Sequence, residues 1–166
     1  MHDGMLVPGA ERPTIRFERV LACSPDEVWQ ALTDREALRA WFPCDVVVGE
    51  WVVGAPIRFV FAEHGFETTG IVLEVDEPHR LRFTWGEETL TMALAPVPGG
   101  TRLVFDDELA GDIAARNAAG WEVCLDRLAG APVDGPTWQA RFEAYVADFE
   151  ERLGPQQGPP PGAGAG

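Results

Sequence analysis

RLRFTWGEETLTMALAPVPGGTRLVFDDE, residues 80–108, is the stretch that decides the fold. It contains three runs of alternating apolar and polar residues, separated by Gly86-Glu87 and by Pro98-Gly99-Gly100, which are typical turn sequences. Alternation with a period of two places one kind of side chain on each face of a strand. The stretch therefore predicts three antiparallel strands with one apolar face and one face rich in Arg and Thr.

The same pattern continues upstream. Ile57, Phe59 and Phe61 alternate with other residues, and 63–65 (Glu-His-Gly) has turn composition before the next alternating run. We expect an antiparallel meander from about residue 45 to residue 109. A single further layer must then cover its apolar face.

Helical signals lie on both sides of this meander. Ser24-Pro25-Asp26-Glu27 has the form of a capping box with Pro at the first helical position. A long helix beginning at Asp112 carries a stripe at helical spacing, made of Ile113, Asn117, Trp121, Cys124, Leu125 and Leu128. Successive strands followed by a covering helix predict the α+β class, because a parallel sheet would need helices between its strands.

The length of 166 residues suits one domain. We expect a flexible N-terminal arm over residues 1–13, the folded domain over 14–153, and a disordered Pro/Gly tail over 154–166. Thr137 is the expected cap of a final helix, whose apolar stripe is Trp138, Phe142, Tyr145, Val146, Phe149 and Leu153. That stripe either packs on its own domain or, if exposed, forms a homodimer through this helix.

Charge and residue inventory exclude several functions. The net charge is −14, from 27 acidic and 13 basic residues, so we expect no nucleic-acid partner. No apolar run approaches the ~20 residues that span a bilayer, so we expect no membrane insertion. The chain has no Lys, which excludes a P-loop lysine and Schiff-base chemistry.

The remaining inventory predicts a cytoplasmic protein without metal or cofactor. Residues 1–8 lack the basic and apolar segments of an export signal. Cys23, Cys44 and Cys124 are odd in number and far apart, so they indicate neither a disulfide framework nor a zinc site. Buried free thiols are the simpler interpretation.

Five segments, in this order, resemble a known superfamily. They are Ser24–Trp29 with Ala31–Asp34, Leu38–Phe42, Pro78–Trp85, Gly100–Leu103 and Gly120–Leu128. Together they resemble the START-like superfamily, also called SRPBCC, and within it the branch related to the activator of the heat-shock protein 90 ATPase. The resemblance covers about residues 14–130.

The resemblance implies a helix-grip fold, in which a curved antiparallel sheet wraps around a long C-terminal helix with an apolar cavity between them. Members of the superfamily bind lipids, polyketides, plant hormones or other small apolar molecules, while some are cyclases, hydrolases or chaperone partners. The fold alone therefore does not define the function.

Two polar residues lie on faces that are otherwise apolar. Asp107 alternates with Leu103 and Phe105, at a position where the family often carries His, and Asn117 lies on the stripe of the long helix. A buried carboxylate must find donors or take up a proton. Either Asp107 lies near an open rim or pairs with an Arg such as Arg58, or Asp107 and Asn117 orient the polar group of a mostly apolar ligand.

The aromatic residues allow two interpretations: they form a solid core, or they line the cavity that the family implies. On the second interpretation the ligand-binding residues are Trp41, Phe59, Phe61, Trp85, Met92, Phe105, Asp107, Asn117, Trp121 and Cys124.

Three functions follow as hypotheses. The first is binding of a small hydrophobic or amphipathic molecule in the cavity, as a carrier or sensor. The second is a cofactor-independent cyclase-like or hydrolase-like enzyme that uses the same cavity, with Asp107 as acid or base. The third is a chaperone-interacting module, which only the resemblance suggests.

Overall fold

The computed structural model of the chain describes residues 3–132 and 134–159. Its strands are β1 (Met5–Leu6), β2 (Thr14–Leu21), β3 (Asp45–Val48), β4 (Pro56–Phe61), β5 (Phe66–Asp76), β6 (Arg80–Trp85), β7 (Glu88–Val97) and β8 (Gly100–Glu108). Its α-helices are α1 (Pro25–Thr33), α2 (Arg35–Arg39), α3 (Ala114–Leu128) and α4 (Trp138–Leu153). Single 3-10 turns at Ala62–His64 and Gly111–Ile113 complete the structure.

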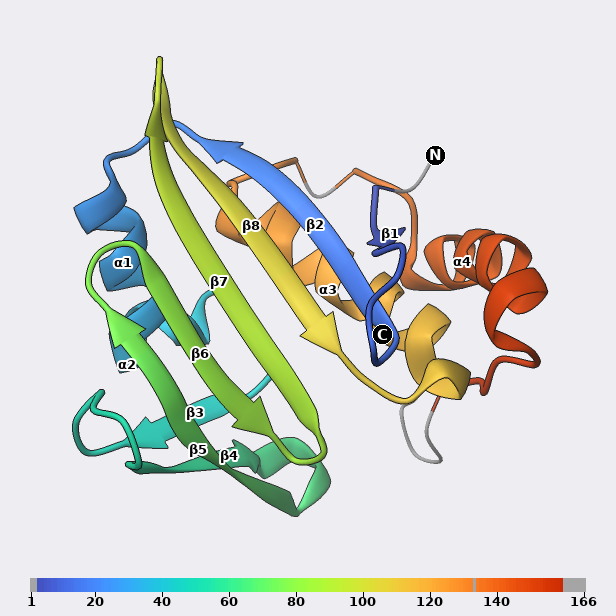
Figure 1. Cartoon of the computed structure of the whole chain (residues 1–166), viewed down its shortest axis with the longest axis horizontal. Helices are drawn as coiled ribbons and strands as arrows, with labels where there is room; N and C mark the ends of the chain where they lie inside the picture. Colours follow the sequence, from blue (N-terminus) through green and yellow to red (C-terminus); the bar gives the residue numbers. More distant parts are fainter. Residues whose placement is uncertain (1–2, 133, 160–166) are drawn as a thin grey trace.

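The strands form one antiparallel, curved sheet in the order β1-β2-β8-β7-β6-β5-β4-β3 (Figure 1). From β3 to β8 every strand pairs with its neighbour in sequence, so the predicted meander is confirmed. The first long strand, β2, returns to pair with β8. The α+β class predicted from the order of the elements is therefore correct.

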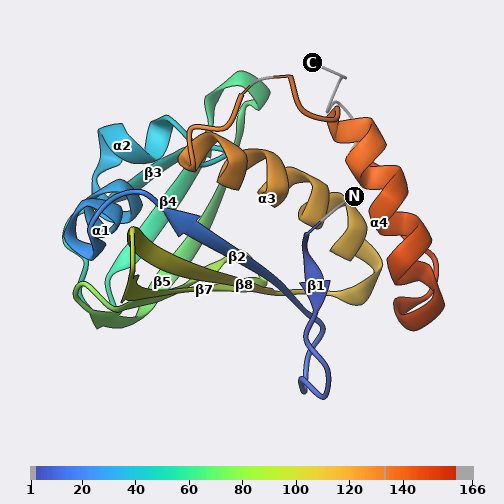
Figure 2. The same cartoon turned by 90° about the horizontal axis from the view of Figure 1, so that it is seen from above.

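Helix α3 lies across the inner face of the sheet, and α1 and α2 cover the other part of that face (Figure 2). The cap of α1 forms as predicted: Ser24 Oγ accepts from the amide of Glu27, whose carboxylate accepts from the Ser24 amide. The arrangement is a helix grip, because the sheet curves around α3 and buries its apolar side. None of the helices in the described ranges has the length and apolar character needed to cross a membrane.

Helix α4 begins after a Thr137 cap, as expected, and packs beside α3 (Figure 2). Tyr145 and Phe149 on its apolar stripe are fully buried within the chain. Trp138, Phe142 and Val146 of the same stripe are partly buried, so α4 packs on its own domain and enlarges the core. A homodimer through this helix stays a prediction.

A buried charged network links α4, α3 and the N-terminal segment. The Glu122 carboxylate of α3 accepts from Tyr145 Oη at 2.9 Å and from Arg141 Nη1 at 2.8 Å. It also accepts from the Asp3 amide at 3.0 Å, while the Gly4 amide donates to Tyr145 Oη at 2.8 Å. Buried charges need such partners, since an unpaired carboxylate in the interior is costly.

These contacts correct the predicted ends of the domain. Residues 3–13, expected to be a flexible arm, include β1, which pairs with β2. Part of the expected disordered tail is also ordered, since the side chain of Gln156 accepts from the Ala115 amide at 2.9 Å and donates to the Gly111 carbonyl at 2.9 Å. The predictions for residues 1–2 and 160–166 lie outside the described residues.

Candidate ligand-binding site

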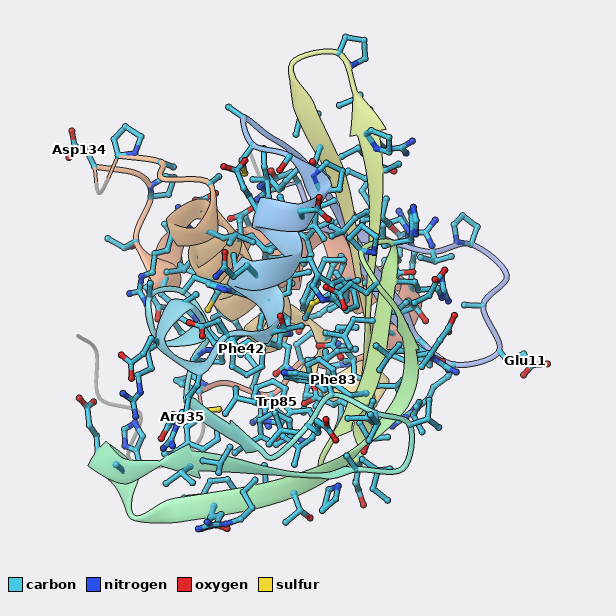
Figure 3. All side chains as sticks on the ribbon, turned by 90° about the vertical axis from the view of Figure 1, so that its left-hand side faces the viewer. Glu11, Arg35, Phe42, Phe83, Trp85 and Asp134 are labelled. Carbon is cyan, nitrogen blue, oxygen red and sulfur yellow. The ribbon has the colours of Figure 1, made fainter. Side chains whose placement is uncertain are left out.

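The region between α3 and the sheet is an aromatic cluster. Trp121 of α3 contacts the rings of Phe105, Trp85 and Phe42, with centroid separations of 4.7, 5.1 and 5.4 Å. Phe59 stacks on Phe42 at 6.1 Å. Figure 3 shows Phe42, Phe83 and Trp85 between the helices and the sheet.

The rings in contact fill the space in which the resemblance implied an empty cavity. Two open hollows among the described residues lie elsewhere, at the surface. One, of about 500 Å³, is lined by α1 residues together with Trp51, Val75 and Glu77, and the other, of about 360 Å³, lies between residues 6–14 and the end of α4. The aromatic residues thus act as core in this structure, and a ligand can enter only if rings move.

Asp107 lies inside this aromatic cluster and is completely buried. The sheet places it there, because residues 103, 105 and 107 of β8 point to the same face. Trp121 Nε1 donates a hydrogen bond of 2.8 Å to Asp107 Oδ2. Neither a position at an open rim nor a pair with Arg58 is correct, since Arg58 pairs with Glu67, at 2.6 Å between Nε and Oε1.

Glu88 is the site residue that the sequence prediction missed. It lies two residues before Leu90, which pairs with Asp107 across β7 and β8, so Glu88 and Asp107 are diagonal neighbours on the inner face. Asn117 Nδ2 of α3 donates to Glu88 Oε1. A signal was present in the sequence, because Glu88 has the same strand spacing as Leu90 and Met92 and therefore lies on their apolar face.

Burial sets the protonation of this carboxyl pair. Desolvation is the main cause that raises the pKa of Glu88 far above its ordinary range, and the adjacent Asp107 raises it further. Desolvation also raises the pKa of Asp107, while hydrogen bonds from Trp121 and Asn117 act in the opposite direction. Glu88 is therefore the neutral, proton-carrying member of the pair at neutral pH, and the pair titrates as a unit.

Trp85 Nε1 is a buried donor beside Trp121 without an acceptor among the described residues, and Asp107 Oδ1 is a buried acceptor without an N–H donor there. The neutral Glu88 carboxyl lies beside Asp107, and its hydrogen bond favours the ionised form of Asp107, which lowers the pKa of Asp107. Trp85 pairs with Glu88 across β6 and β7, so both atoms belong to one small region. Buried polar atoms are normally paired, and each exception calls for a physical explanation.

The other predicted site residues are divided between this region and the core. Phe61 stacks on Trp85 at 6.2 Å and is only partly buried, which places it at the edge of the aromatic cluster. Met92 is buried opposite Phe105. Trp41 contacts Phe42 but donates to the Ala31 carbonyl at 2.9 Å, so it joins α1 to α2, and Cys124 is a buried free thiol.

The curved sheet around α3, with polar groups set into an aromatic interior, defines a START-like helix-grip protein. Residues 22–131 match the family model described as Activator of Hsp90 ATPase homolog 1-like protein, and the chain belongs to this family. None of the curated proteins matches the chain.

Solved structures share this fold. A conserved protein of unknown function from Enterococcus faecalis, EF2215, has 24% identity and a TM-score of 0.75, covering 89% of this chain and 91% of its own. CV1439 from Chromobacterium violaceum is 30% identical, with a TM-score of 0.57 and coverage of 70% and 95%. DynU16, from the dynemicin biosynthetic locus, is 27% identical, with a TM-score of 0.61 and coverage of 70% and 46%.

Proposed function

We propose that this protein binds a small, neutral amphipathic molecule between α3 and the sheet. The apolar body of the ligand packs against the aromatic cluster, and its polar group bonds to Asp107 and Trp85. The single observation that carries this proposal is the buried donor Trp85 Nε1, which has no acceptor among the described residues and lies in the same region as Asp107 Oδ1, an acceptor without an N–H donor. Few, convergent polar groups in an apolar wall are typical of small-molecule sites.

The chemistry of these two atoms defines the polar group. Trp85 Nε1 is only a donor and an ionised Asp107 oxygen only an acceptor. A hydroxyl or amide group satisfies both at once, because it accepts and donates. An anionic group would lie beside two carboxyls in a protein of net charge −14, and is therefore disfavoured.

The edge of the aromatic cluster is the proposed entrance. Trp85 and Phe61 are only partly buried, and their rings stack on each other at this edge. A ligand that displaces the Trp85 and Phe61 rings at this edge reaches Asp107 without disturbing the sheet. Binding without a cofactor and a cytoplasmic location remain predictions from the sequence.

A titration with 2-naphthol, a neutral aromatic alcohol, tests the proposal. Tryptophan fluorescence should report binding, and 2-methoxynaphthalene, which cannot donate, should bind about tenfold more weakly, the equivalent of one hydrogen bond. Asp107→Asn should remove the preference for the alcohol. Asp106→Asn is the matched control, since Asp106 pairs with Arg16 and not with the site. Equal affinities of the wild type for both naphthalenes would contradict the proposal.

The family description supports a second candidate, a chaperone-interacting module. A pull-down with purified Hsp90 tests it directly. Association that persists in the Asp107→Asn protein would show that chaperone contact is independent of the proposed ligand site.

A further inference from the structure

We infer that Glu88 and Asp107 form an acid–base pair that moves a proton at a carbon next to a carbonyl group of the bound ligand. This inference rests on the proposed function, because it uses the same site. It adds a reaction class, carbon-acid proton transfer, and a residue, Glu88, that ligand binding alone does not require.

The geometry brings two carboxyls together in an apolar interior. Glu88 on β7 and Asp107 on β8 lie on the same face of the sheet. Glu88 is two residues before Leu90, the residue that pairs with Asp107. Each is held by a different donor of α3, Glu88 by Asn117 Nδ2 and Asp107 by Trp121 Nε1. Two carboxyls so placed cannot both ionise, so the pair holds one proton and contains a base and an acid at once.

The two members have different roles because their surroundings differ. Asp107 receives hydrogen bonds from Trp121, Asn117 and Glu88 that favour its ionised form, and its Oδ1 has no N–H donor among the described residues, so it is the base. Glu88 is the neutral acid, and the groups that oppose its protonation, Arg116 and Arg12, have smaller effects than burial and Asp107. Pairs of carboxyls driven to different protonation states mark acid–base sites.

The proton transfer is balanced without an oxidant or a cofactor. Asp107 Oδ1 takes the proton from the carbon, the electron pair of the C–H bond forms a C=C bond, and the carbonyl π electrons move to oxygen. Trp85 Nε1 and the protonated Glu88 carboxyl donate hydrogen bonds to that oxygen, which stabilises the enolate. Asp107 then returns the proton to carbon. Trp121 and Asn117 are positioning residues, because they act through the two carboxyls.

Hydrogen–deuterium exchange of 1-tetralone in D₂O tests the inference. This bicyclic aromatic ketone has α-hydrogens whose exchange proton NMR follows directly, and saturation-transfer NMR on the same sample reports binding. The wild-type protein should exchange these hydrogens at least about 100-fold faster than buffer, the usual effect of general acid–base catalysis. Asp107→Asn and Glu88→Gln should each return the rate to within about tenfold of buffer while saturation transfer persists.

A control variant and three possible results separate the inference from the proposed function. Asp106→Asn, on the other face of β8, should exchange at the wild-type rate. Bound 1-tetralone that exchanges at the buffer rate would overturn the inference and leave the proposed function intact. Wild-type rates in both carboxyl variants would also overturn it. The absence of both binding and exchange would overturn the inference as well, while the titration with 2-naphthol tests the proposed function separately. If Asp107→Asn does not fold, Glu88→Gln decides alone, since it changes only the partly exposed member of the pair.

Discussion

The indole of Trp121 donates its only hydrogen bond to the completely buried carboxylate of Asp107, at 2.8 Å. This contact joins the covering helix to the last strand of the meander. It also explains how a carboxyl remains in an aromatic interior, because a hydrogen bond to a charged group offsets part of the cost of its burial.

We expect Trp121→Phe to lower the free energy of unfolding by about 2 kcal/mol at pH 8, since it leaves a buried carboxylate with one donor fewer. The cost should be smaller at pH 5, because loss of this donor raises the pKa of Asp107 further and the group is then neutral. Urea denaturation at the two pH values measures both effects. Trp138→Phe is the control: Trp138 stacks on Phe142 in α4, and its replacement should cost the same at both pH values.

The contribution of Glu88 and Asp107 to stability should fall as the pH rises, because their pKa values in the folded state lie above those of the unfolded chain. These two groups bind more protons in the folded state, so their part of the free energy of unfolding decreases from about pH 4 through neutral pH. The lowered pKa values of Asp45, Glu67 and Glu122 act in the opposite direction, but only at acid pH. Glu88→Gln should remove part of this dependence, and its stability relative to wild type should improve by about 2 kcal/mol between pH 5 and pH 9. Parallel stability curves for the two proteins would contradict the assigned protonation.

Replacement by alanine should change the stability of the protein in opposite directions at two glycines, Gly70 and Gly120. A Cβ at Gly70 in β5 would lie 1.8 Å from the Thr84 carbonyl oxygen and 3.0 Å from the Phe59 ring, so Gly70→Ala should destabilise the protein by about 2–3 kcal/mol. A Cβ at Gly120 would meet no atom within 4 Å, so Gly120→Ala should stabilise the helix by about 0.5–1 kcal/mol. Thermal unfolding of the two variants checks both signs in one experiment.

Tyr145→Phe should loosen the N-terminal segment. The substitution removes the hydroxyl that donates to Glu122 and accepts from the Gly4 amide, at an expected cost of about 1–2 kcal/mol. Hydrogen exchange measured by mass spectrometry should show faster exchange in residues 3–6 and unchanged exchange in the β6–β7 hairpin. Equal protection of residues 3–6 in both proteins would show that β1 pairing alone holds this segment.

The meander, the capped helices and the family could be predicted from short-range patterns, because alternation, turn residues and capping boxes are local. Asp107 and Asn117 were also identified, since a polar residue on an apolar stripe is visible in the sequence. Glu88 was missed because its meaning depends on the register of β7 with β8. Glu122 was missed because its partners are distant in the sequence: Asp3 lies 119 residues before it, and Arg141 and Tyr145 lie 19 and 23 residues after it.

By itself, the sequence determined the class of fold, the face of each strand and the helix that covers the sheet, because the side-chain periods of strand and helix are properties of neighbouring residues. Only the tertiary structure decided that the aromatic rings pack against one another, that Asp107 bonds to Trp121 and not to Arg58, and that Glu88 lies beside it. Packing and protonation depend on atoms brought together from distant parts of the chain, so no local pattern could determine them.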